Sequence, residues 1–392
     1  MTLTPHAARH GLLRAQDCHL DDLLALIAEG TDAADYPYAT GVEQGVVVYA
    51  ADRLREALAA GEGEDVEAEL VKAWADGPGI VVITGAFAAP VVDRVTAAYE
   101  QIIVAEKATG GERGDHFGKP GANDRIWNAL EKLAVADPEA FVDYYANDLV
   151  ALGARAWLGP GYQVTAQANV VRPGGKAQTV HRDYHLGFMD EQQAARYPAH
   201  VHAMSPQLTL QGAIAHVDMP VESGPTLYLP HSQKYSHGYL AYWLPEFQEY
   251  FQANHIQLPL AKGDLVWFNP ALMHAAGTNV STDIQRFANL LQVSSAFGRA
   301  MEAIDRQRVV GAIYPALLAA LSAGMESGAA DHVVAASAEG YAFPSNLDLD
   351  QPVDGMAPPT QADLVRQALA ARSEPAALGE RLAAQARTKL SH

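Results

Sequence analysis

The chain has 392 residues, of which 49% are hydrophobic and 19% are charged, so it can bury one large core or two smaller ones as a globular protein. Its formal net charge of -19 gives no electrostatic reason to expect nucleic acid or an anionic membrane as a partner. A single cysteine, Cys18, excludes an internal disulfide framework and a cysteine-rich zinc or iron–sulfur site.

The sequence contains no apolar run long enough to span a bilayer. Its first residues, MTLTPHAARHGLLRAQ, lack the apolar core of a signal peptide. A lone cysteine also fits a reducing compartment. We therefore expect a cytoplasmic protein that binds neither nucleic acid nor a membrane.

The first part of the chain is predicted to be mainly helical. Residues 1–75 are acidic and carry apolar residues three or four positions apart, with glycines after these runs. Residues 77–87, GPGIVVITGAF, are a β-branched run between glycines, which indicates a buried strand. Helical periodicity returns in 90–108 and in 137–159.

Short strands are predicted from about 161 to 298, because the turn sequences RPGG, ESGP and AKGD separate runs of β-forming residues. This spacing is typical of an antiparallel sandwich or barrel. The expected strands are YQVTAQANVV, TVHRDYHLGF, LTLQGAIAHVD, PTLYLP, DLVWFN and FANLLQVSSAF. Beyond 300 the sequence is alanine-rich and helical again. The predicted fold class is therefore α+β, with helices before and after a β core.

Metal-ligand side chains are concentrated in the stretch QTVHRDYHLGF. In an extended strand, residues i and i+2 share a face, so His181 and Asp183 can chelate one ion while Arg182 points away. Asp183 and His185 have the same spacing, and spacing alone does not choose between the two pairs. A third ligand must come from elsewhere, and His274 at the end of GDLVWFNPALMH is the candidate.

Two imidazoles and a carboxylate on one face of a metal form a facial triad, whose open positions suit oxygen chemistry at Fe(II). Zinc hydrolases use the same ligand types, so the ligands alone do not identify the metal. In the strand IQRFANLLQVS, Arg286 alternates with apolar residues and is expected to face inward. A buried guanidinium needs an anionic partner, and a dicarboxylate co-substrate would supply one.

These stretches resemble the phytanoyl-CoA dioxygenase family of Fe(II)- and 2-oxoglutarate-dependent oxygenases, over roughly 75–298. QTVHRDYH resembles the family's His-x-Asp strand. ESGPTLYLPHSQK resembles its glycine turn and Pro-Gly-Ser-His-like segment, in which His231 replaces a small residue. KGDLVWFNPALMHAAGTNVS resembles the strand that ends in the distal histidine, and DIQRFANLLQVS resembles the segment that carries the co-substrate arginine.

The resemblance implies a double-stranded β-helix core, of the jelly-roll or cupin-like kind, over 76–300. Helical extensions are then expected at 1–75 and 301–392. The resemblance also implies that the metal ligands, and hence the catalytic residues, are His181, Asp183 and His274.

The resemblance further implies a 2-oxoglutarate site in which Arg286 holds the distal carboxylate. Gln178 and Thr226 match residues that bind 2-oxoglutarate in members acting on fungal alkaloids and meroterpenoids, and Asn169 is expected to join them. With His181 as the ligand, His185 is left facing the pocket as a substrate contact.

The expected function is an Fe(II)- and 2-oxoglutarate-dependent dioxygenase that uses O2 to hydroxylate, or otherwise oxidise, an unactivated C–H bond of a small organic molecule in secondary metabolism. Because Asp183 fills a ligand position, halogenation is not expected. Two alternatives stay open: a cupin-like metal-dependent hydrolase or isomerase, and a binding protein without catalytic activity. The helical tail beyond 300 is compatible with a lid or with the surface of a homodimer.

Overall fold

The computed structural model describes residues 11–109, 123–183, 186–187, 189–352 and 355–391. Its elements group into two compact units that alternate along the chain. The described residues of the first unit lie in 11–89, 123–125 and 168–291, and those of the second in 90–109, 126–167 and 292–391.

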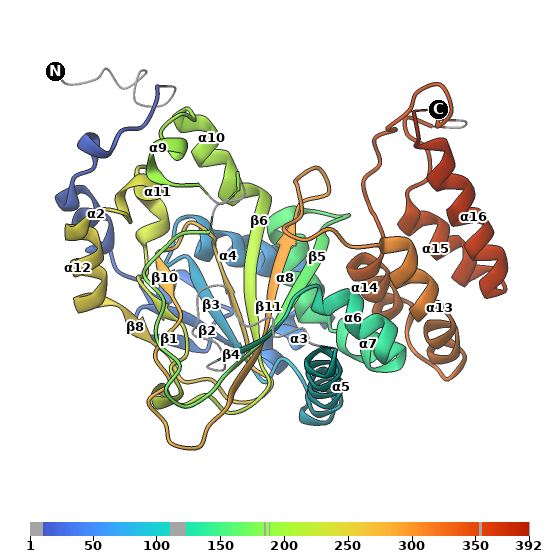
Figure 1. Cartoon of the computed structure of the whole chain (residues 1–392), viewed down its shortest axis with the longest axis horizontal. Coiled ribbons are helices and arrows are strands. Elements are labelled where there is room, and N and C mark those ends of the chain that lie inside the picture. The colour runs from blue at the N-terminus through green and yellow to red at the C-terminus, as the bar shows by residue number, and fades with distance from the viewer. Residues whose placement is uncertain (1–10, 110–122, 184–185, 188, 353–354, 392) are drawn as a thin grey trace. The chain divides into compact units, whose positions relative to one another are not determined.

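The strands form a large, mostly antiparallel sheet and a small one (Figure 1). The large sheet has the order β1-β2-β3-β9-β6-β11-β5-β4, and the small sheet has the order β10-β7-β8. The strand bounds are β1 Gly41–Glu43, β2 Val46–Ala50, β3 Ile80–Thr84, β4 Asn123–Ile126, β5 Gln163–Val171, β6 Thr209–Ala215, β7 Leu227–Tyr228, β8 Ile256–Gln257, β9 Leu265–Phe268, β10 His274–Ala275 and β11 Arg286–Ser294. The pair β2–β3 is parallel, whereas β1–β2, β3–β9, β6–β9, β7–β8 and β10–β7 are antiparallel.

An apolar cluster in the first unit joins residues of both sheets. Because successive residues of a strand point to opposite faces, the large sheet contributes alternate residues of β2, β3 and β9. These are Val46, Val48, Ile80, Val82, Val266 and Phe268. The small sheet contributes Tyr228 and Ile256. The core of this unit therefore lies directly beside β7, the strand that pairs with β10.

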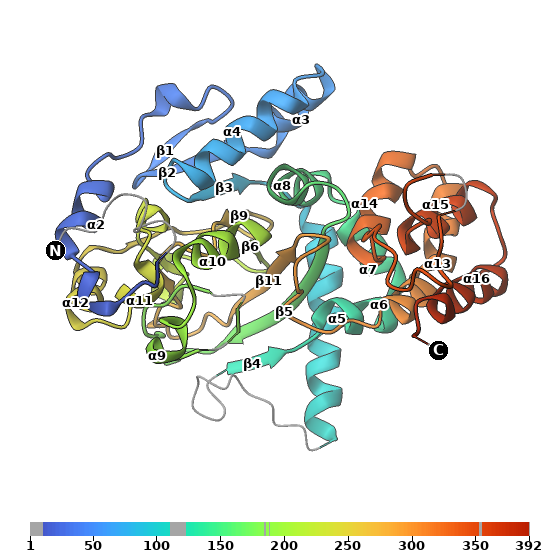
Figure 2. The ribbon, with the colours of Figure 1, turned by 90° about the horizontal axis from the view of Figure 1, so that it is seen from above.

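Helices of the first unit pack against these strands, α3 against β2 and α4 against β3. Helix α4 contacts both α3 and β3 (Figure 2). The bounds are α2 Leu20–Ile27, α3 Ala51–Ala59, α4 Gly63–Ala75, α9 Glu191–Ala194, α10 Ala199–Met204, α11 Gly238–Ala241 and α12 Pro245–Asn254. Trp74 at the end of α4 is fully buried, and its indole N–H donates to the Trp267 carbonyl of β9 at 3.3 Å. That bond ties the helical layer to the sheet.

The second unit consists mainly of helices. Its helices are α5 Ala89–Ala108, α6 Ala129–Ala136, α7 Pro138–Tyr145, α8 Asp148–Leu158, α13 Arg306–Ser322, α14 Ser327–Ser337, α15 Gln361–Ala370 and α16 Pro375–Thr388. Helix α13 packs against α6, α7, α14 and α16. Its buried stripe includes Val309, Ile313 and Leu317, whose spacing of four residues places them on one side of the helix.

The structure confirms most of the predicted elements and corrects three. Residues 1–75 are not helical throughout, because 41–43 and 46–50 are strands; the valine run after Gly45 favours a strand and pairs with β3. The helix predicted over 137–159 is two helices, since Asn147 caps a new helix with its side chain. The strand predicted at 179–188 is, among its described residues, a single bridge from His181 to His274.

No helix within the described residues is both long enough and apolar enough to cross a membrane. The cytoplasmic location and the division of the chain at 1–75, 76–300 and 301–392 stay predictions.

Candidate metal centre

His181 and His274 are brought together by backbone hydrogen bonds. The N–H of His181 donates to the His274 carbonyl at 2.9 Å, and the N–H of His274 donates back to the His181 carbonyl at 3.0 Å. Two residues that face each other in an antiparallel pair project on the same side, and the two imidazole centroids are 4.5 Å apart. Because His274 belongs to β10, this bridge places His181 at the edge of the small sheet, on the side of β10 opposite β7.

In each of the two imidazole rings, Nδ1 is held by a backbone carbonyl oxygen. Nδ1 of His181 lies 2.9 Å from the Thr179 carbonyl oxygen, and Nδ1 of His274 lies 2.8 Å from the Leu272 carbonyl oxygen. A carbonyl oxygen only accepts, so in both rings Nδ1 is the nitrogen that carries hydrogen. Each Nε2 is left with a lone pair for a metal ion.

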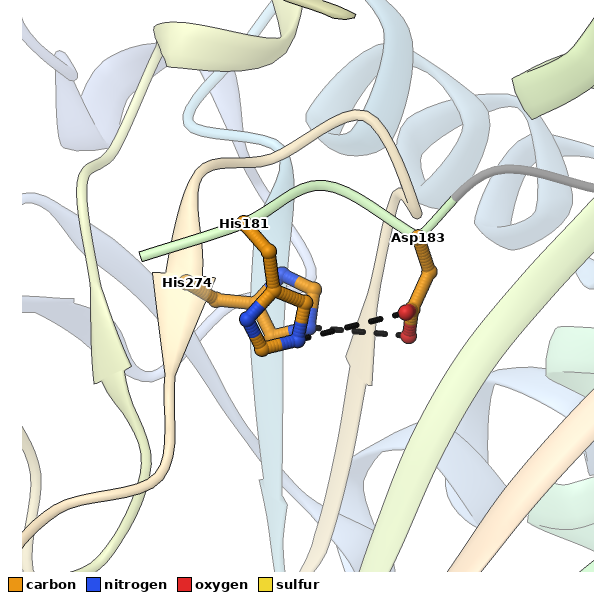
Figure 3. A group of neighbouring side chains, drawn as sticks. All are labelled: His181, Asp183 and His274. Atoms are coloured by element: carbon orange, nitrogen blue, oxygen red, sulfur yellow. Dashed lines mark ion pairs between the residues drawn. The ribbon is translucent and has the colours of Figure 1, made fainter. Parts of the chain in front are cut away.

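The two Nε2 atoms and the Asp183 carboxylate point toward one another (Figure 3). Nε2 of His181 is 3.9 Å from one carboxylate oxygen, and Nε2 of His274 is 3.6 Å from the other. These separations are too long for good hydrogen bonds, and lone pairs face a negative charge across them. A shared cation resolves that opposition, and all ligand atoms lie within 4.8 Å of one another.

Asp183 is held by three further contacts. Its backbone N–H donates to the Pro270 carbonyl at 3.1 Å, and its carbonyl accepts from the Tyr239 hydroxyl at 3.2 Å. The amide of Gln211 on β6 donates to the carboxylate oxygen Oδ2. Burial alone raises the pKa of Asp183, but the imidazoles of His274 and His181 in their protonated form, together with the Gln211 amide, outweigh it and hold the pKa well below its usual range.

A buried arginine supports the two ligand segments from behind. Arg182, between the ligands His181 and Asp183, is 4% exposed and donates to the Ser232 carbonyl. The Ser232 hydroxyl in turn accepts from the backbone N–H of Met273 at 2.8 Å, one residue before His274. Arg182 thus points away from the metal centre, as the strand pattern predicts, and links both ligand segments through Ser232.

The loop that contains Ser232 takes an unusual backbone conformation at His231. Its φ is +68°, in the left-handed region that favours glycine. Its Nε2 lies 3.0 Å from the Thr31 hydroxyl, a contact that glycine could not make. The replacement of a small residue at this position is therefore accommodated by the side chain, while the backbone keeps a glycine-like shape.

Arg286, the first residue of β11, is a buried cation that donates hydrogen bonds to backbone carbonyl oxygens. It is 7% exposed, and Nη1 donates to the Gly277 carbonyl at 3.2 Å and to the Ser223 carbonyl at 3.5 Å. Within the described parts of the chain, no carboxylate pairs with it. Burial lowers the pKa of Arg286 to about 10, which still leaves it charged at neutral pH. A buried charge of this kind calls for an anion.

The glycine turn before β7 shapes the wall around Arg286. Gly224 has φ +75°, and a Cβ there would collide with the Thr278 carbonyl and lie 2.8 Å from the Asn279 nitrogen. Only glycine both adopts this conformation readily and allows that approach. The turn brings the Ser223 carbonyl to the guanidinium, next to the segment that follows His274.

Of the other predicted co-substrate residues, Gln178 and Thr226 lie near the small sheet, and Asn169 lies on the large sheet. Gln178 lies beside β10, where its N–H donates to the Ala276 carbonyl at 3.0 Å and its side-chain oxygen accepts from the Ala276 N–H at 3.3 Å. Thr226 is half-buried next to the Tyr228 hydroxyl. Asn169 lies on β5, and its side-chain oxygen is buried without a partner among the described residues. His185, the predicted substrate contact, lies outside the described residues.

Several residues around the centre are not found by sequence reasoning. Gln211 supports Asp183, Phe268 packs edge-on against His274 with centroids 4.9 Å apart, and Tyr239 contacts the Asp183 carbonyl. Gln211 leaves a signal, because it is the one amide in the otherwise apolar run LQGAIA. Phe268 and Tyr239 look like ordinary core residues, and only the fold brings them to the site.

The sequence model of the family described as phytanoyl-CoA dioxygenase matches residues 75–288. The chain belongs to this family. It is accordingly an enzyme of the dioxygenase superfamily, with iron, 2-oxoglutarate and O2 as its cofactors and co-substrates. The donor set of two imidazole nitrogens and one carboxylate fits iron.

Solved structures similar to this chain include two enzymes of nogalamycin biosynthesis and AviO1, all at low sequence identity. The non-heme alpha ketoglutarate dependent epimerase SnoN from nogalamycin biosynthesis is 18% identical to this chain. The match covers 60% of this chain and 82% of SnoN, with a TM-score of 0.41. The carbocyclase SnoK from the same biosynthesis is 20% identical, with 58% and 84% covered and a TM-score of 0.43. AviO1 from Streptomyces viridochromogenes Tue57 is 18% identical, with 59% and 96% covered and a TM-score of 0.41. No curated protein matches the chain.

Proposed function

We propose that this member of the phytanoyl-CoA dioxygenase family hydroxylates an unactivated C–H bond of a small organic molecule in secondary metabolism. One observation carries the proposal beyond a generic metal centre: Arg286 is buried without a carboxylate partner among the described residues. It contacts Gly277, three positions after His274. A dicarboxylate that reached the metal at one end could therefore meet a buried guanidinium at the other.

For the fold, the proposal is a double-stranded β-helix over 76–300. The apolar cluster shared by the large and small sheets supports this, since such a core is formed by two sheets facing each other. The regions 1–75 and 301–392 are then extensions around the core.

In the proposed site, His181, Asp183 and His274 hold Fe(II). When bound, iron with 2-oxoglutarate and O2 supplies the oxidising power for attack on a C–H bond, with succinate and CO2 as by-products. The two backbone carbonyls that accept from Nδ1 keep each Nε2 free and oriented. Gln211 occupies one carboxylate oxygen of Asp183 and so orients the other.

The co-substrate residues are proposed to be Arg286, Gln178, Thr226 and Asn169. Arg286 offers a planar pair of donors to the far carboxylate. Gln178 and Thr226 lie on segments joined to β10, Gln178 through Ala276 and Thr226 through β7. Asn169 is included because a buried amide oxygen without a partner is costly unless a ligand or water satisfies it.

The substrate is proposed to be a small natural product, with His185 as a contact in the pocket. His185→Ala should leave iron binding and slow, substrate-free consumption of 2-oxoglutarate unchanged and reduce only substrate turnover. A loss of iron equal to that of His181→Ala would instead assign the ligand pair to Asp183 and His185. A homodimer is part of the same proposal.

The alternative of a cupin-like hydrolase or isomerase has no observation in its favour. It would leave Arg286 and Gln178 without a co-substrate to hold. A screen of metabolite extracts, monitored by succinate release from the iron-loaded enzyme in air, tests the proposed function and identifies the substrate. Release that depends on iron, O2 and an added metabolite supports it; turnover of a metabolite without succinate release contradicts it.

A further inference from the structure

A pocket of about 410 Å³ lies in the second unit, beside the start of α13. Its wall is formed by residues 299–304, by Arg306 at the first position of α13, by Gln163 at the start of β5 and by Glu339 after α14. All of these residues belong to the second unit, whereas the three metal ligands belong to the first. A volume of this size is typical of small-molecule sites.

Arg306 is a buried cation in the wall of this pocket. It is 9% exposed, and its Nη1 donates to the Ala336 carbonyl at 2.9 Å while its Nη2 donates to the Val164 carbonyl at 2.8 Å. No carboxylate in the described parts of the chain forms an ion pair with it. Burial lowers the pKa of Arg306 to about 10, which leaves it charged at neutral pH. A guanidinium has five N–H groups, so further donors remain.

A second cation, Arg299, is exposed and belongs to the same wall. It has no carboxylate partner among the described residues. The two glutamates of the wall accept from backbone N–H groups instead: Oε1 of Glu302 from Asn128 at 2.8 Å, and Oε1 of Glu339 from Tyr341 at 3.0 Å. One anion could therefore meet both guanidinium groups, and the planar fork of arginine suits a carboxylate.

Apolar side chains form another part of the wall. Met301 is 37% exposed, and Ile304 is half-buried. Gln163 fixes the segment that leads to them, because its amide donates to the Ser295 carbonyl at 2.8 Å and to the Gly298 carbonyl at 3.0 Å. The pocket thus offers apolar surface beside two cations.

We infer that this pocket binds a small organic carboxylate, whose anionic group is held by Arg299 and Arg306 and whose apolar part contacts Met301 and Ile304. The inference goes beyond the proposed function, because the pocket contains no metal ligand and no proposed co-substrate residue. Residues 299–306 and Glu339 also lie outside 75–288, the part of the chain that matches the family model. Membership of the family therefore assigns no ligand to this pocket.

Hexanoate is the probe, because it combines one carboxylate with an apolar chain. It is titrated calorimetrically into the iron-loaded protein without oxygen, with 2-oxoglutarate present to occupy the iron. We expect saturable binding of hexanoate. Acetate has the same carboxylate but four fewer CH2 groups, so it should bind about 10-fold more weakly in a half-open pocket. Hexylamine has the same chain with a positive charge and should not bind.

Arg299→Gln tests the role of the cations, because Arg299 is exposed and its replacement should not disturb the fold. Arg306 stays in place, since its bonds to Val164 and Ala336 also hold the fold. Arg299→Gln should weaken hexanoate about 5-fold, the effect of removing one partly exposed ion pair.

Arg308→Gln is the matched control. It removes the same charge near the start of α13, but the Arg308 guanidinium pairs with Glu131 at 3.2 Å and is not part of the wall. This variant should bind hexanoate as the wild type does. The inference would be overturned by a wild type without saturable hexanoate binding, by Arg299→Gln with wild-type affinity, by equal weakening in both variants, or by hexylamine binding as tightly as hexanoate.

Discussion

The two ends of the site differ in how their charges are balanced. At the metal end, Asp183 faces two imidazoles, and each of these groups is fixed by hydrogen bonds from its own or a neighbouring segment. At the other end, Arg286 is buried, and the hydrogen bonds that it makes to described residues go to the carbonyls of Gly277 and Ser223. The metal end is organised by the protein, and we propose that a ligand completes the arginine end.

This difference predicts that changes at the two ends affect different ligands. A change at the metal end should lower iron affinity and everything that depends on it. A change at the arginine end should lower co-substrate affinity and leave iron binding intact, because Arg286 contacts none of the three ligand side chains.

Removal of a metal ligand should have the largest effect. His274→Ala should abolish turnover and weaken iron by more than the roughly 10- to 100-fold that loss of an outer hydrogen-bond partner costs. Iron affinity is measured by competition with a chelator. His255→Ala, at the C-cap of α12 and outside the site, is the control. Normal turnover by His274→Ala would remove the metal assignment.

Arg286→Ala should act on the co-substrate alone. Loss of a bidentate, charge-assisted pair should raise the Kd for 2-oxoglutarate about 30- to 1000-fold, and lysine should recover only part of it because it lacks the planar fork. The titration is made into iron-loaded, oxygen-free protein. Arg299→Ala serves as comparison; if it, and not Arg286→Ala, weakens binding, Arg299 holds the carboxylate and the account of β11 is wrong.

Gln211→Leu tests how far the metal end depends on its support. The substitution keeps a similar volume but removes the donor to Asp183, so iron affinity should fall about 10-fold. Affinity for 2-oxoglutarate, measured at saturating iron, should change little. Gln248→Leu, an amide on α12 that bonds the Tyr242 carbonyl, is the control. Unchanged iron affinity in Gln211→Leu would mean that the histidines alone orient Asp183.

His231→Gly should have the smallest effect, and one that depends on pH. Burial, with Lys234 nearby, lowers the pKa of His231 to about 4 in the folded state. In the unfolded state the imidazole has its ordinary pKa of about 6.5, so it takes up a proton at pH values where the folded state stays neutral. The wild type therefore loses stability as pH falls from about 6.5 toward 4, and the variant escapes this loss.

Denaturant unfolding of both proteins at pH 7.5 and pH 5 measures the difference. At the higher pH, relief of the left-handed strain and loss of the Thr31 contact should nearly cancel, each being about 1 kcal/mol. At the lower pH the variant should be the more stable protein relative to wild type. A difference that is the same at both pH values would contradict the burial of a neutral His231.

Sequence patterns were sufficient for residues whose role depends on local spacing. The separation of His181 and Asp183 and the alternation around Arg286 predict which side each faces, and the strands at 77–87 and within 161–298, apart from 179–188, follow from β-branched runs between turns. The family resemblance supplied the choice of His181 over His185 as a ligand.

Residues whose role depends on long-range pairing could not be found in this way. Gln211 reaches Asp183 only through the placement of β6. The strands at 41–50 were missed because they lie among helical periodicities and are stabilised by β3. Tertiary pairing of this kind overrides local propensity.

The most direct test of the account is whether a single site binds both Fe(II), through the metal end, and 2-oxoglutarate, through Arg286. Fe(II) is added to the wild-type protein without oxygen, 2-oxoglutarate is titrated in, and the weak visible charge-transfer band of the iron-bound 2-oxo acid is followed. The account predicts a saturable band that His274→Ala lacks and that Arg286→Ala reaches only at a much higher 2-oxoglutarate concentration. A wild type that binds iron but gives no such band, or a band equally strong at equal concentrations in Arg286→Ala, would contradict it.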